Sequence, residues 1–395
     1  MVDNPTETQR LWDEMLQSMR RDGVLNSSDV DAAFSAVPRH LFLPDISIEK
    51  VYKNRAIGLK KDGSGLLTSS SSQPSMMAIM LNQLQLQTGD NILEIGTASG
   101  YNAAIMQHIV GKSGTVTTVE IDNDLAETAH KNLQRAHMSR VMVVNADGAQ
   151  GYSPRAAYDH IVVTVGVWDI PSVWFSQLKL KGSLVAPIVL DGVQVSATFK
   201  PMSDGTFLSK DNRPCAFVYM LGSNAGPNFR KQLGTSGLFV LADQVDNIDT
   251  VSLSMLLSDD HAFCQFEHGL EPQDYWNGYQ IYLMLNQPEK YIFFVYSVFE
   301  DQQAFGLDGQ GIGLFTKGTA ALAGYHEKGV VHCFAGSDAF LEMQTVSDKW
   351  FAEEKPSTEQ LRLKLIPKEL GRPEVERGRI FDRRDHYLHA WFDVD

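Results

Sequence analysis

A short apolar segment that runs into a turn of small residues constrains this chain more than any other feature of its sequence. The apolar segment covers residues 91–95, the turn covers residues 96–100, and a helical pattern begins at Tyr101. A strand that enters such a turn lets backbone N–H groups and the N-terminus of the next helix approach a ligand closely. A second expected strand ends in Glu120, an acid that can accept hydrogen bonds from ribose hydroxyls. The pattern predicts a binding site for a nucleoside-bearing cofactor.

Apolar strands and amphipathic helices alternate between residues 75 and 188. Repeated strand–helix units favour a parallel sheet that is covered by helices on both faces. A helical stretch that contains Trp174 and Leu178 is expected before the last of these strands. The expected strands are residues 91–95, 115–120, 141–145, 161–165 and 183–188.

The pattern changes after residue 188. Two strand-like runs, residues 193–199 and 216–221, lie on either side of a polar turn at residues 204–205. Such runs predict an antiparallel pair that is added at the edge of the sheet.

A stretch rich in Gly, Ser, Asn and Pro at residues 222–227 is typical of a linker. We therefore predict two domains, residues 1–222 and residues 223–395. The second domain is expected to be an α+β unit, with a strand at residues 291–299 and a helix that Ser337 could cap.

Length, charge and cysteine content exclude several classes of protein. The chain has 395 residues, of which 43% are hydrophobic, so it can fill at least two cores. A net charge of −14 argues against binding nucleic acid, which requires a basic surface. Three scattered cysteines do not predict disulfides, and no apolar stretch is long enough to predict a membrane span. The N-terminus lacks a signal-peptide pattern, so we expect a cytoplasmic protein without a nucleic-acid or membrane partner.

A third acidic residue follows another strand of the predicted sheet. Residues 141–145 run into Asp147 and Gly148, at the same edge of the sheet as the first turn. Glu94, Glu120 and Asp147 should then surround one crevice. The turn also lacks the Gly-x-Gly-x-x-Gly spacing of dinucleotide sites, so a cationic ligand that carries adenosine fits better than a diphosphate.

Several further segments occur in an order that resembles the protein-L-isoaspartate O-methyltransferase family. The resemblance covers roughly residues 1–222, and it implies a Rossmann-like class I methyltransferase fold with a seven-stranded sheet. It also implies S-adenosylmethionine as methyl donor and a carboxylate of an aspartyl or isoaspartyl residue in a peptide as acceptor. The segments that carry the resemblance are residues 37–44, 52–56, 71–74, 158–164, 170–171 and 177–178, together with the glycine turn and the two acids that follow it.

The resemblance also implies roles for individual residues. Ser72 falls on the active-site serine of the family, although a serine here could instead cap the helix that begins near Pro74. Basic residues that could bind a peptide carboxylate are Arg39, His40 and Arg55. The expected cofactor-binding residues are Ser69, Ser70, Ser71, Glu94, Gly96, Thr97, Gly100, Glu120, Asp147 and Gly148.

A metal site is not expected. His261, Cys264 and His268 have a spacing that could suit zinc, but the sequence offers no evident fourth ligand. Glu94 has a second interpretation as well, because it could cap or brace the turn without touching a cofactor.

The chain departs from the family pattern at three places. Ala98 stands where glycine is usual, Ser70-Ser71 stand where Thr-Ile is usual, and residues 60–65 are atypical. The chain also continues for more than 170 residues beyond Leu221.

Long relatives of this kind resemble enzymes that modify ribosomally made peptides. We therefore expect methylation of an aspartyl or isoaspartyl carboxylate in a modified precursor peptide, such as a cyclised one, which then closes to a succinimide. The alternatives are a general protein-repair methyltransferase and a binding module that has lost catalysis.

Overall fold

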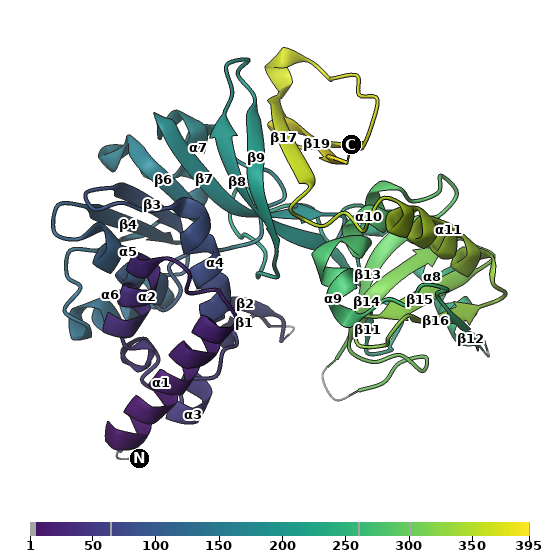
Figure 1. The fold of residues 1–395 in the computed structure, drawn as a ribbon, viewed down its shortest axis with the longest axis horizontal. Coiled ribbons are helices and arrows are strands. Elements are labelled where there is room, and N and C mark those ends of the chain that lie inside the picture. Colours follow the sequence, from purple (N-terminus) through teal and green to yellow (C-terminus); the bar gives the residue numbers. More distant parts are fainter. Residues whose placement is uncertain (1–4, 64, 260, 300–301, 395) are drawn as a thin grey trace. The chain divides into compact units, whose positions relative to one another are not determined.

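The computed structural model describes residues 5–63, 65–259, 261–299 and 302–394, and the chain forms two compact units (Figure 1). The first unit contains Met1–Pro187, Ser196–Asp211 and Cys215–Ala225. The second unit contains Ile188–Val195, Asn212–Pro214 and Gly226–Asp395. The boundary predicted between residues 222 and 223 lies inside the last segment of the first unit, and the domain assignment stays a prediction.

The first unit is built on a sheet whose central strands are parallel, as the strand–helix alternation predicts. Strand β3 lies between β4 and β6, and the register places Ile92 beside Val116 and beside His160. β5 pairs with β4 and β7 pairs with β6, again in parallel. The strand order is β9-β8-β7-β6-β3-β4-β5. The bounds are β3 Asn91–Ile95, β4 Thr115–Glu120, β5 Met142–Asn145, β6 Tyr158–Val163, β7 Leu178–Leu190, β8 Val193–Pro201 and β9 Phe207–Pro214.

Helices connect these strands, and an N-terminal group of helices completes the hydrophobic core of the first unit. Ile92, Ile105 and Val116 are fully buried in this core, together with Met19 and Phe34 from the N-terminal helices. Pro74 opens α4, where its missing N–H costs nothing. The helix bounds are α1 Pro5–Arg21, α2 Ser28–Ala36, α3 Ile48–Val51, α4 Pro74–Leu84, α5 Tyr101–Val110, α6 Asn123–Arg135 and α7 Ser172–Ser176.

Two predictions for the sheet edge are wrong. The neighbour of β8 is β9, which begins at Phe207, whereas residues 216–221 form no strand and make only an isolated parallel bridge between Tyr219 and Gly166. Leu178 lies in β7 and not in a helix, because α7 ends at Ser176. Both errors come from apolar runs whose partners lie far away in the sequence.

The second unit contains an antiparallel seven-stranded sheet with the order β10-β11-β13-β14-β15-β16-β12. α8 packs Leu253 and Leu257 into a core with Leu322 and Phe334. α11 packs on β14, β15 and β16. The strand bounds are β10 Arg230–Gln232, β11 Leu238–Leu241, β12 His261–Gln265, β13 Ile292–Val298, β14 Gln310–Phe315, β15 Ala320–Gly324 and β16 Val330–Phe334.

The remaining elements of the second unit include three further strands, in which β19 lies between β17 and β18. The bounds are α8 Thr250–Leu257, α9 Pro272–Asp274, α10 Gln280–Leu285, α11 Asp338–Ala352, β17 Leu361–Pro367, β18 Arg379–Asp382 and β19 His386–Phe392. The predicted α+β character of the C-terminal part is confirmed. Ser337 occupies the N-cap position of α11, although its side chain makes no capping hydrogen bond.

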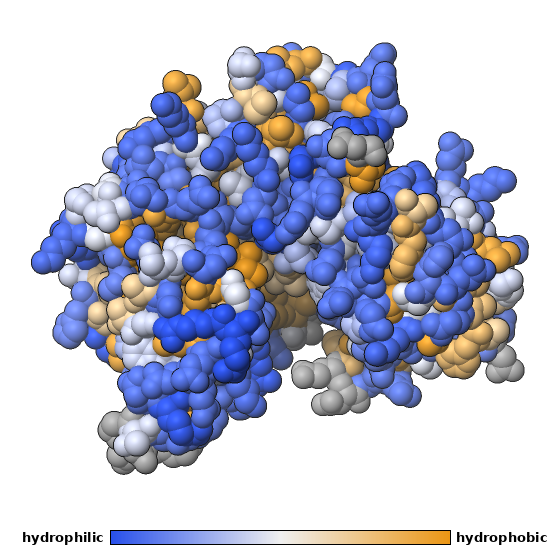
Figure 2. Space-filling model, viewed as in Figure 1, coloured by the Kyte–Doolittle hydropathy of each residue, from blue (hydrophilic) through white to orange (hydrophobic). Residues whose placement is uncertain are grey.

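Polar residues cover most of the face in view in Figure 2, and apolar residues on it are scattered in small groups. Among the described helices, none combines the length and the apolar character that crossing a bilayer requires.

Candidate functional site

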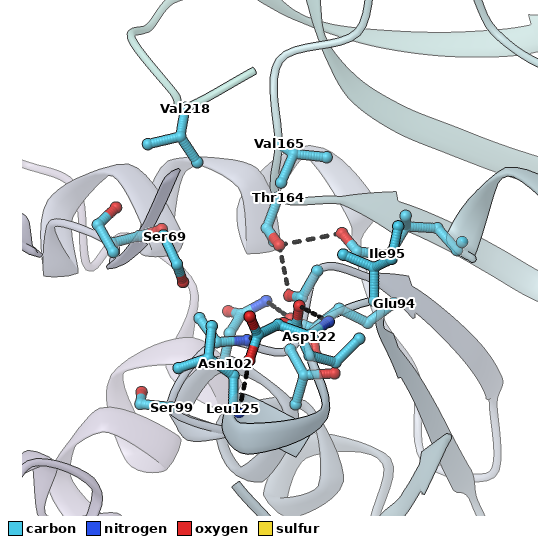
Figure 3. A pocket seen from close by; sticks show the side chains of 18 of the residues that line it. Ser69, Glu94, Ile95, Ser99, Asn102, Asp122, Leu125, Thr164, Val165 and Val218 are labelled. Carbon is cyan, nitrogen blue, oxygen red and sulfur yellow. Dashed lines mark hydrogen bonds between the residues drawn. The ribbon is translucent and has the colours of Figure 1, made fainter. Parts of the chain in front are cut away.

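A cavity opens in the first unit, where β3, β4 and β6 end (Figure 3), and its empty volume is about 850 Å³ when the open solvent at its mouth is counted. Each of these strands contributes its last residues or the turn that follows it, because the carboxyl ends of parallel strands meet at one edge of a sheet. Glu94 lies in β3 and Gly96 in the turn after it. Glu120 is the last residue of β4, and Thr164 directly follows β6. Ser69–Ser72 form another wall.

Two glycines allow the backbone to lie close to neighbouring groups at the cavity. Gly96 has a φ of +99°, and a Cβ atom there would lie 2.6 Å from Thr164 Oγ1. A Cβ atom on Gly148 would lie 2.6 Å from Ile95 Cγ2. Gly100 does not line the cavity, and a Cβ atom there would approach Leu133 of α6. Its place in the turn therefore serves the packing of α5 against α6.

Glu94 is fully buried beneath the turn. Its Oε1 accepts a hydrogen bond from Asn102 Nδ2 at 2.7 Å, and its Oε2 accepts one from Thr118 Oγ1 at 2.6 Å. Burial raises the pKa of Glu94 to about 7, against the opposing effect of these two donors. Thr97 is also held from below, by a hydrogen bond of 2.7 Å between its hydroxyl and Thr118 Oγ1.

Glu120 joins the two turns that border the cavity. Its Oε2 accepts a hydrogen bond from the N–H of Ala98 at 2.9 Å, and its Oε1 accepts one from the N–H of Asp122 at 3.1 Å. A carboxylate has four lone-pair sites, so acceptor capacity remains for a ligand. Ala98 itself adopts a φ of +47°, a conformation that favours glycine.

Asp147 does not line the cavity, but Gly148 does. The carboxylate of Asp147 accepts hydrogen bonds from the N–H groups of Ala149 and Ser223 at 2.9 and 2.7 Å. Burial would raise the pKa of Asp147, but these backbone donors outweigh it and hold the pKa below its usual range. Asp147 therefore ties the segment at residues 215–225 to the turn after β5.

That segment supplies a wall that the sequence did not predict. Val218–Leu221 line the cavity, and the N–H of Gly166 donates to Val218 O at 2.8 Å. The N–H of Met220 donates in turn to Gly166 O at 2.9 Å. The apolar run that suggested an edge strand thus crosses the end of the sheet and borders the cavity.

The serine run approaches from a small antiparallel hairpin of β1 (Ile57–Lys61) and β2 (Leu67–Ser71). Ser69, Ser70, Ser71 and Ser72 all line the cavity. Lys60 on β1 forms ion pairs with Asp122 and Asp124 at the start of α6. These two ion pairs hold the hairpin beside the turn that follows β4.

Arg39 holds the end of the serine run from behind. Its fully buried guanidinium donates to Ser71 O at 3.3 Å and to Ser72 O at 3.0 Å, and also to the carbonyls of Val51, Lys53 and Arg55. Burial lowers the pKa of Arg39 to about 10, so the group stays charged at neutral pH. A guanidinium so enclosed does not face the cavity, which corrects the expectation that it binds a substrate carboxylate.

The other two basic residues also lie outside the cavity lining. His40 Nδ1 lies 2.6 Å from the hydroxyl of Tyr52, and Arg55 is exposed. The structure therefore does not bring Arg39, His40 and Arg55 together with Ser72 in this cavity.

The lining fits a cationic, adenosine-bearing cofactor. Among the residues that the structure describes, the lining includes Glu94, Glu120 and Asp122 but no Lys, Arg or His. The carboxylate of Glu120 would repel a diphosphate there, whereas it would attract a sulfonium. Ile95, Ile121 and Leu125 add apolar surface that suits a purine face.

Within the described residues, no group of three or more His, Cys, Asp or Glu is placed to hold a metal ion. His261 and Cys264 lie on one strand at an odd spacing, so their side chains point to opposite faces of the sheet. His268 lies 3.5 Å from Asp348.

Several lining residues escaped the sequence reasoning. They have no motif of their own, and only the strand order brings them to the cavity. The clearest signal for Thr164 was its place directly after a strand of the parallel sheet. The missed residues are Thr68, Met77, Ile95, Ala98, Ser99, Tyr101, Asn102, Val119, Ile121, Asp122, Leu125, Thr164, Val165 and Val218–Leu221.

Comparisons with known proteins point to one family. The sequence profile described as "Protein-L-isoaspartate(D-aspartate) O-methyltransferase (PCMT)" matches residues 10–225. A protein-L-isoaspartate O-methyltransferase of Thermococcus sibiricus is 34% identical over 218 residues, which cover 54% of this chain and 95% of that protein. Protein-L-isoaspartate O-methyltransferase 1 of Archaeoglobus fulgidus is 41% identical over 174 residues, which cover 44% and 78% of the two chains.

One solved structure, of a protein named protein-L-isoaspartate O-methyltransferase, is similar over both units. The match covers 97% of this chain and 100% of that chain, with a TM-score of 0.53 and 22% sequence identity. The likeness concerns the fold, and it extends into the C-terminal part, beyond the segment that the family profile matches.

Proposed function

From its membership in the protein-L-isoaspartate(D-aspartate) O-methyltransferase family, we propose that this chain methylates an aspartyl or isoaspartyl carboxylate of a peptide or protein. The family makes it an S-adenosylmethionine-dependent carboxyl O-methyltransferase, as the sequence predicts. The observation that carries the proposal for the site is the cavity that places Ser72 on one wall and the acidic turns of β3 and β4 on another.

The acidic wall would hold the cofactor. Glu120 would accept hydrogen bonds from ribose hydroxyls, because its carboxylate is fixed by Ala98 and Asp122 and keeps spare lone pairs. Gly96 and Gly148 would let the backbone approach the cofactor closely. Ser69–Ser71 and Thr97 would complete the contacts. When bound, S-adenosylmethionine supplies an electrophilic methyl group.

Three of the predicted contact residues would hold the site in shape without contacting the cofactor. Glu94 braces the turn through Thr118 and Asn102, Asp147 ties down residues 222–223, and Gly100 packs α5 on α6. We assign these three residues a positioning role.

Ser72 would orient the acceptor. A carboxyl group with a pKa near 4 is already ionised at neutral pH, so this chain needs no strong base to generate the nucleophile. The hydroxyl of Ser72 would donate a hydrogen bond to one carboxylate oxygen and so aim the other at the methyl group. The guanidinium of Arg39 keeps Ser72 in place by donating a hydrogen bond to the carbonyl oxygen of Ser72. Fixing this geometry contributes several kcal/mol to lowering the barrier.

The methyl ester would then lead to a succinimide. The backbone nitrogen of the following residue attacks the ester carbonyl, a C–N bond forms, and methanol leaves with the amide proton. This step needs no further residue of the chain.

Two substrate classes follow from two observations. The long C-terminal extension supports a modified ribosomal peptide as substrate, because a second unit can recognise a precursor. General repair of isoaspartyl proteins is supported by the solved structure of like fold, whose protein carries the family name and matches this chain over both units. A cytoplasmic location stays a prediction for either class.

The test is release of S-adenosylhomocysteine from S-adenosylmethionine with three acceptors. These are a short isoaspartyl peptide, its aspartyl counterpart, and a precursor peptide encoded beside the gene. Turnover on the isoaspartyl peptide alone supports repair, and turnover on the precursor peptide alone supports tailoring. Donor binding without turnover on any of the three would favour the inactive binding module.

A pair of serine variants tests the assigned role of Ser72. Ser72→Ala should lower kcat by about tenfold or more while donor affinity stays within about twofold, because only the acceptor loses a hydrogen bond. Ser176→Ala in α7 removes an exposed hydroxyl outside the cavity and is the matched control. Equal kcat values for the two variants would show that Ser72 has no role in catalysis.

A further inference from the structure

The two edges of the seven-stranded sheet in the second unit differ in how they are protected. β10 at one edge has only three residues, Arg230-Lys231-Gln232, and two of them are cationic. β12 at the other edge has five residues, His261–Gln265, with no Lys, Arg or Pro and a regular register to β16. Short strands and charges are the usual protection of a sheet edge against strand pairing. β12 lacks both.

The hydrogen-bond pattern shows which backbone groups of β12 face outward. Phe266 N donates to Gly329 O at 3.0 Å in the same register that pairs Cys264 with Val331. Pairs that exchange hydrogen bonds alternate along an antiparallel ladder. The backbone N–H and C=O groups of Phe263 and Gln265 therefore point away from β16, and in the described part of the chain no strand lies beyond β12.

An apolar side chain stands at the middle of this edge. Phe263 is 67% exposed, and its ring lies 4.9 Å from that of His332, edge to face. A peptide strand laid along β12 would cover Phe263 with the side chain opposite it.

Charge indicates what kind of strand would pair there. Residues 226–349 contain 6 Lys and Arg but 16 Asp and Glu. Exposed carboxylates flank β12 at both ends, with Asp259 two residues before it and Glu267 two residues after it. A second copy of this chain would bring the same negative charge to the contact, whereas a cationic peptide would bring the opposite sign.

We propose that the outer edge of β12 binds an extended, cationic segment of the methyl-acceptor peptide by strand addition. Phe263 and Gln265 supply the backbone ladder, Phe263 supplies the apolar contact, and Asp259 and Glu267 attract flanking Lys or Arg side chains. The identity of the occupant as methyl acceptor rests on the proposed function, whereas the strand pairing does not.

The probe is a twelve-residue peptide of alternating Lys and Val that ends in a flexible isoaspartyl sequence. Two matched peptides differ in one property each. One carries N-methyl groups on alternate backbone amides of the Lys-Val part, and the other carries Glu in place of Lys. Binding to the full chain is measured by fluorescence anisotropy. We expect both matched peptides to bind at least about tenfold more weakly, since the first loses ladder hydrogen bonds and the second meets like charge.

Amide hydrogen exchange locates the contact. Addition of the Lys-Val probe should slow exchange at Phe263 and Gln265, whose N–H groups face outward, and leave Arg230–Gln232 unchanged. Protection at neither Phe263 nor Gln265 would overturn the proposal.

Variants test the contact in binding. Phe263→Ser, and Asp259→Asn combined with Glu267→Gln, should each weaken binding of the Lys-Val probe about fivefold to tenfold in the anisotropy measurement. Both should leave KM unchanged for a four-residue isoaspartyl peptide. Leu370→Ser is the control, because Leu370 is also exposed but follows β17.

The outcomes separate this inference from the proposed function. If the short peptide is methylated and all three long peptides bind equally, the strand-addition proposal is overturned and the proposed function still stands. Failure to bind the donor would overturn the proposed function, and slowed exchange at Phe263 would still support the ladder. A dimer that dissociates in Phe263→Ser would show that a second copy occupies the edge and would also overturn the proposal.

Discussion

The two units use their sheets in opposite ways. In the first unit, parallel strands connected by helices bring the ends of β3, β4 and β6 to one edge, where Glu94, Glu120 and Thr164 border one cavity. In the second unit, antiparallel connections distribute the turns over both ends of the sheet. Some of its ionisable side chains pair with one another, as His332 does with Glu327 at 3.0 Å. A parallel sheet thus concentrates chemistry in a crevice, whereas an antiparallel sheet offers faces and edges.

Buried arginines give the strongest contrast between the units. Arg39 is surrounded by backbone carbonyls behind Ser72, whereas Arg383 forms an ion pair of 2.7 Å with Asp243. Arg39→Met and Arg383→Met should each lower the free energy of unfolding by about 3 kcal/mol or more, because buried acceptors or a buried carboxylate lose their partner. Urea unfolding checks both values.

Activity distinguishes the two arginine variants. Under conditions where both variants are folded, Arg39→Met should also lower kcat, since it releases the backbone of Ser72. Arg383→Met should keep the kcat of the unchanged chain. A loss of kcat in Arg383→Met as large as that in Arg39→Met would break the comparison.

Buried carboxylates that accept hydrogen bonds from backbone amides form the second pair. Glu120 accepts from Ala98 and Asp122, and Asp274 in the second unit accepts from Glu271 N at 3.0 Å. Glu120→Gln places an NH₂ group against one of the two backbone N–H groups. The affinity for S-adenosylmethionine should therefore fall about 100-fold, equal to roughly 2.7 kcal/mol. Asp274→Asn should leave donor affinity unchanged. Calorimetric titration with S-adenosylmethionine measures both, and an unchanged affinity in Glu120→Gln would contradict the assignment of Glu120 to the cofactor.

Glu94 predicts a pH dependence of stability. Burial raises its pKa from 4.5 to about 7, so the folded chain binds a proton that the unfolded chain has already released between these two values. Stability should therefore fall as pH rises from about 4.5 to 7 and stay reduced above pH 7, by no more than about 3 kcal/mol.

Glu94→Gln should remove this pH dependence and stabilise the chain at pH 8. Asn102 can accommodate the change, because its Oδ1 has no hydrogen-bond partner and can turn toward the new amide. Thermal unfolding from pH 4.5 to 8 is the measurement. The same slope in both proteins would show that Glu94 is not the group responsible.

The smallest expected effect concerns two alanines with positive φ. Ala98 beside the cavity has a φ of +47°, and Ala335 in the second unit has a φ of +54°. Replacement by Gly relieves about 1–2 kcal/mol of strain but loses about 0.4–1 kcal/mol through the unfolded chain, so each variant should gain between zero and about 1.6 kcal/mol of stability. Only Ala98→Gly should alter donor affinity. Destabilisation of both variants in thermal unfolding would contradict the strain at these positions.

The sequence predicted the parts of the first unit that depend on local patterns. The strands at residues 91–95 and 115–120 occur as predicted, because each is a short run rich in Ile, Leu, Val or Thr that turn residues bound. Nine of the expected site residues line the cavity: Ser69, Ser70, Ser71, Ser72, Glu94, Gly96, Thr97, Glu120 and Gly148. The residues from Glu94 onward lie at the ends of sheet strands or directly after them, whereas the four serines come from β2 and the residue that follows it.

Long-range contacts account for what the sequence did not reveal. β9 is polar along much of its length, so its sequence does not predict a strand, whereas the apolar run at residues 216–221 does. That run borders the cavity only because Gly166 pairs with Val218 and Met220. Nothing local marks Arg39 as buried, since an arginine is exposed by default and the carbonyls that enclose it come from distant segments.

The late position of Val218–Leu221 in the chain has a consequence for biosynthesis. The ribosome releases the two acidic turns and the serine run well before it releases this wall, and the strands that enter the second unit lie in between. At roughly 5–20 residues per second, the nascent chain spends several seconds with its cofactor pocket open on one side. A gene fragment that stops at residue 217 would give a protein whose pocket lacks this wall. Extending the fragment by eight codons, to residue 225, would restore the wall.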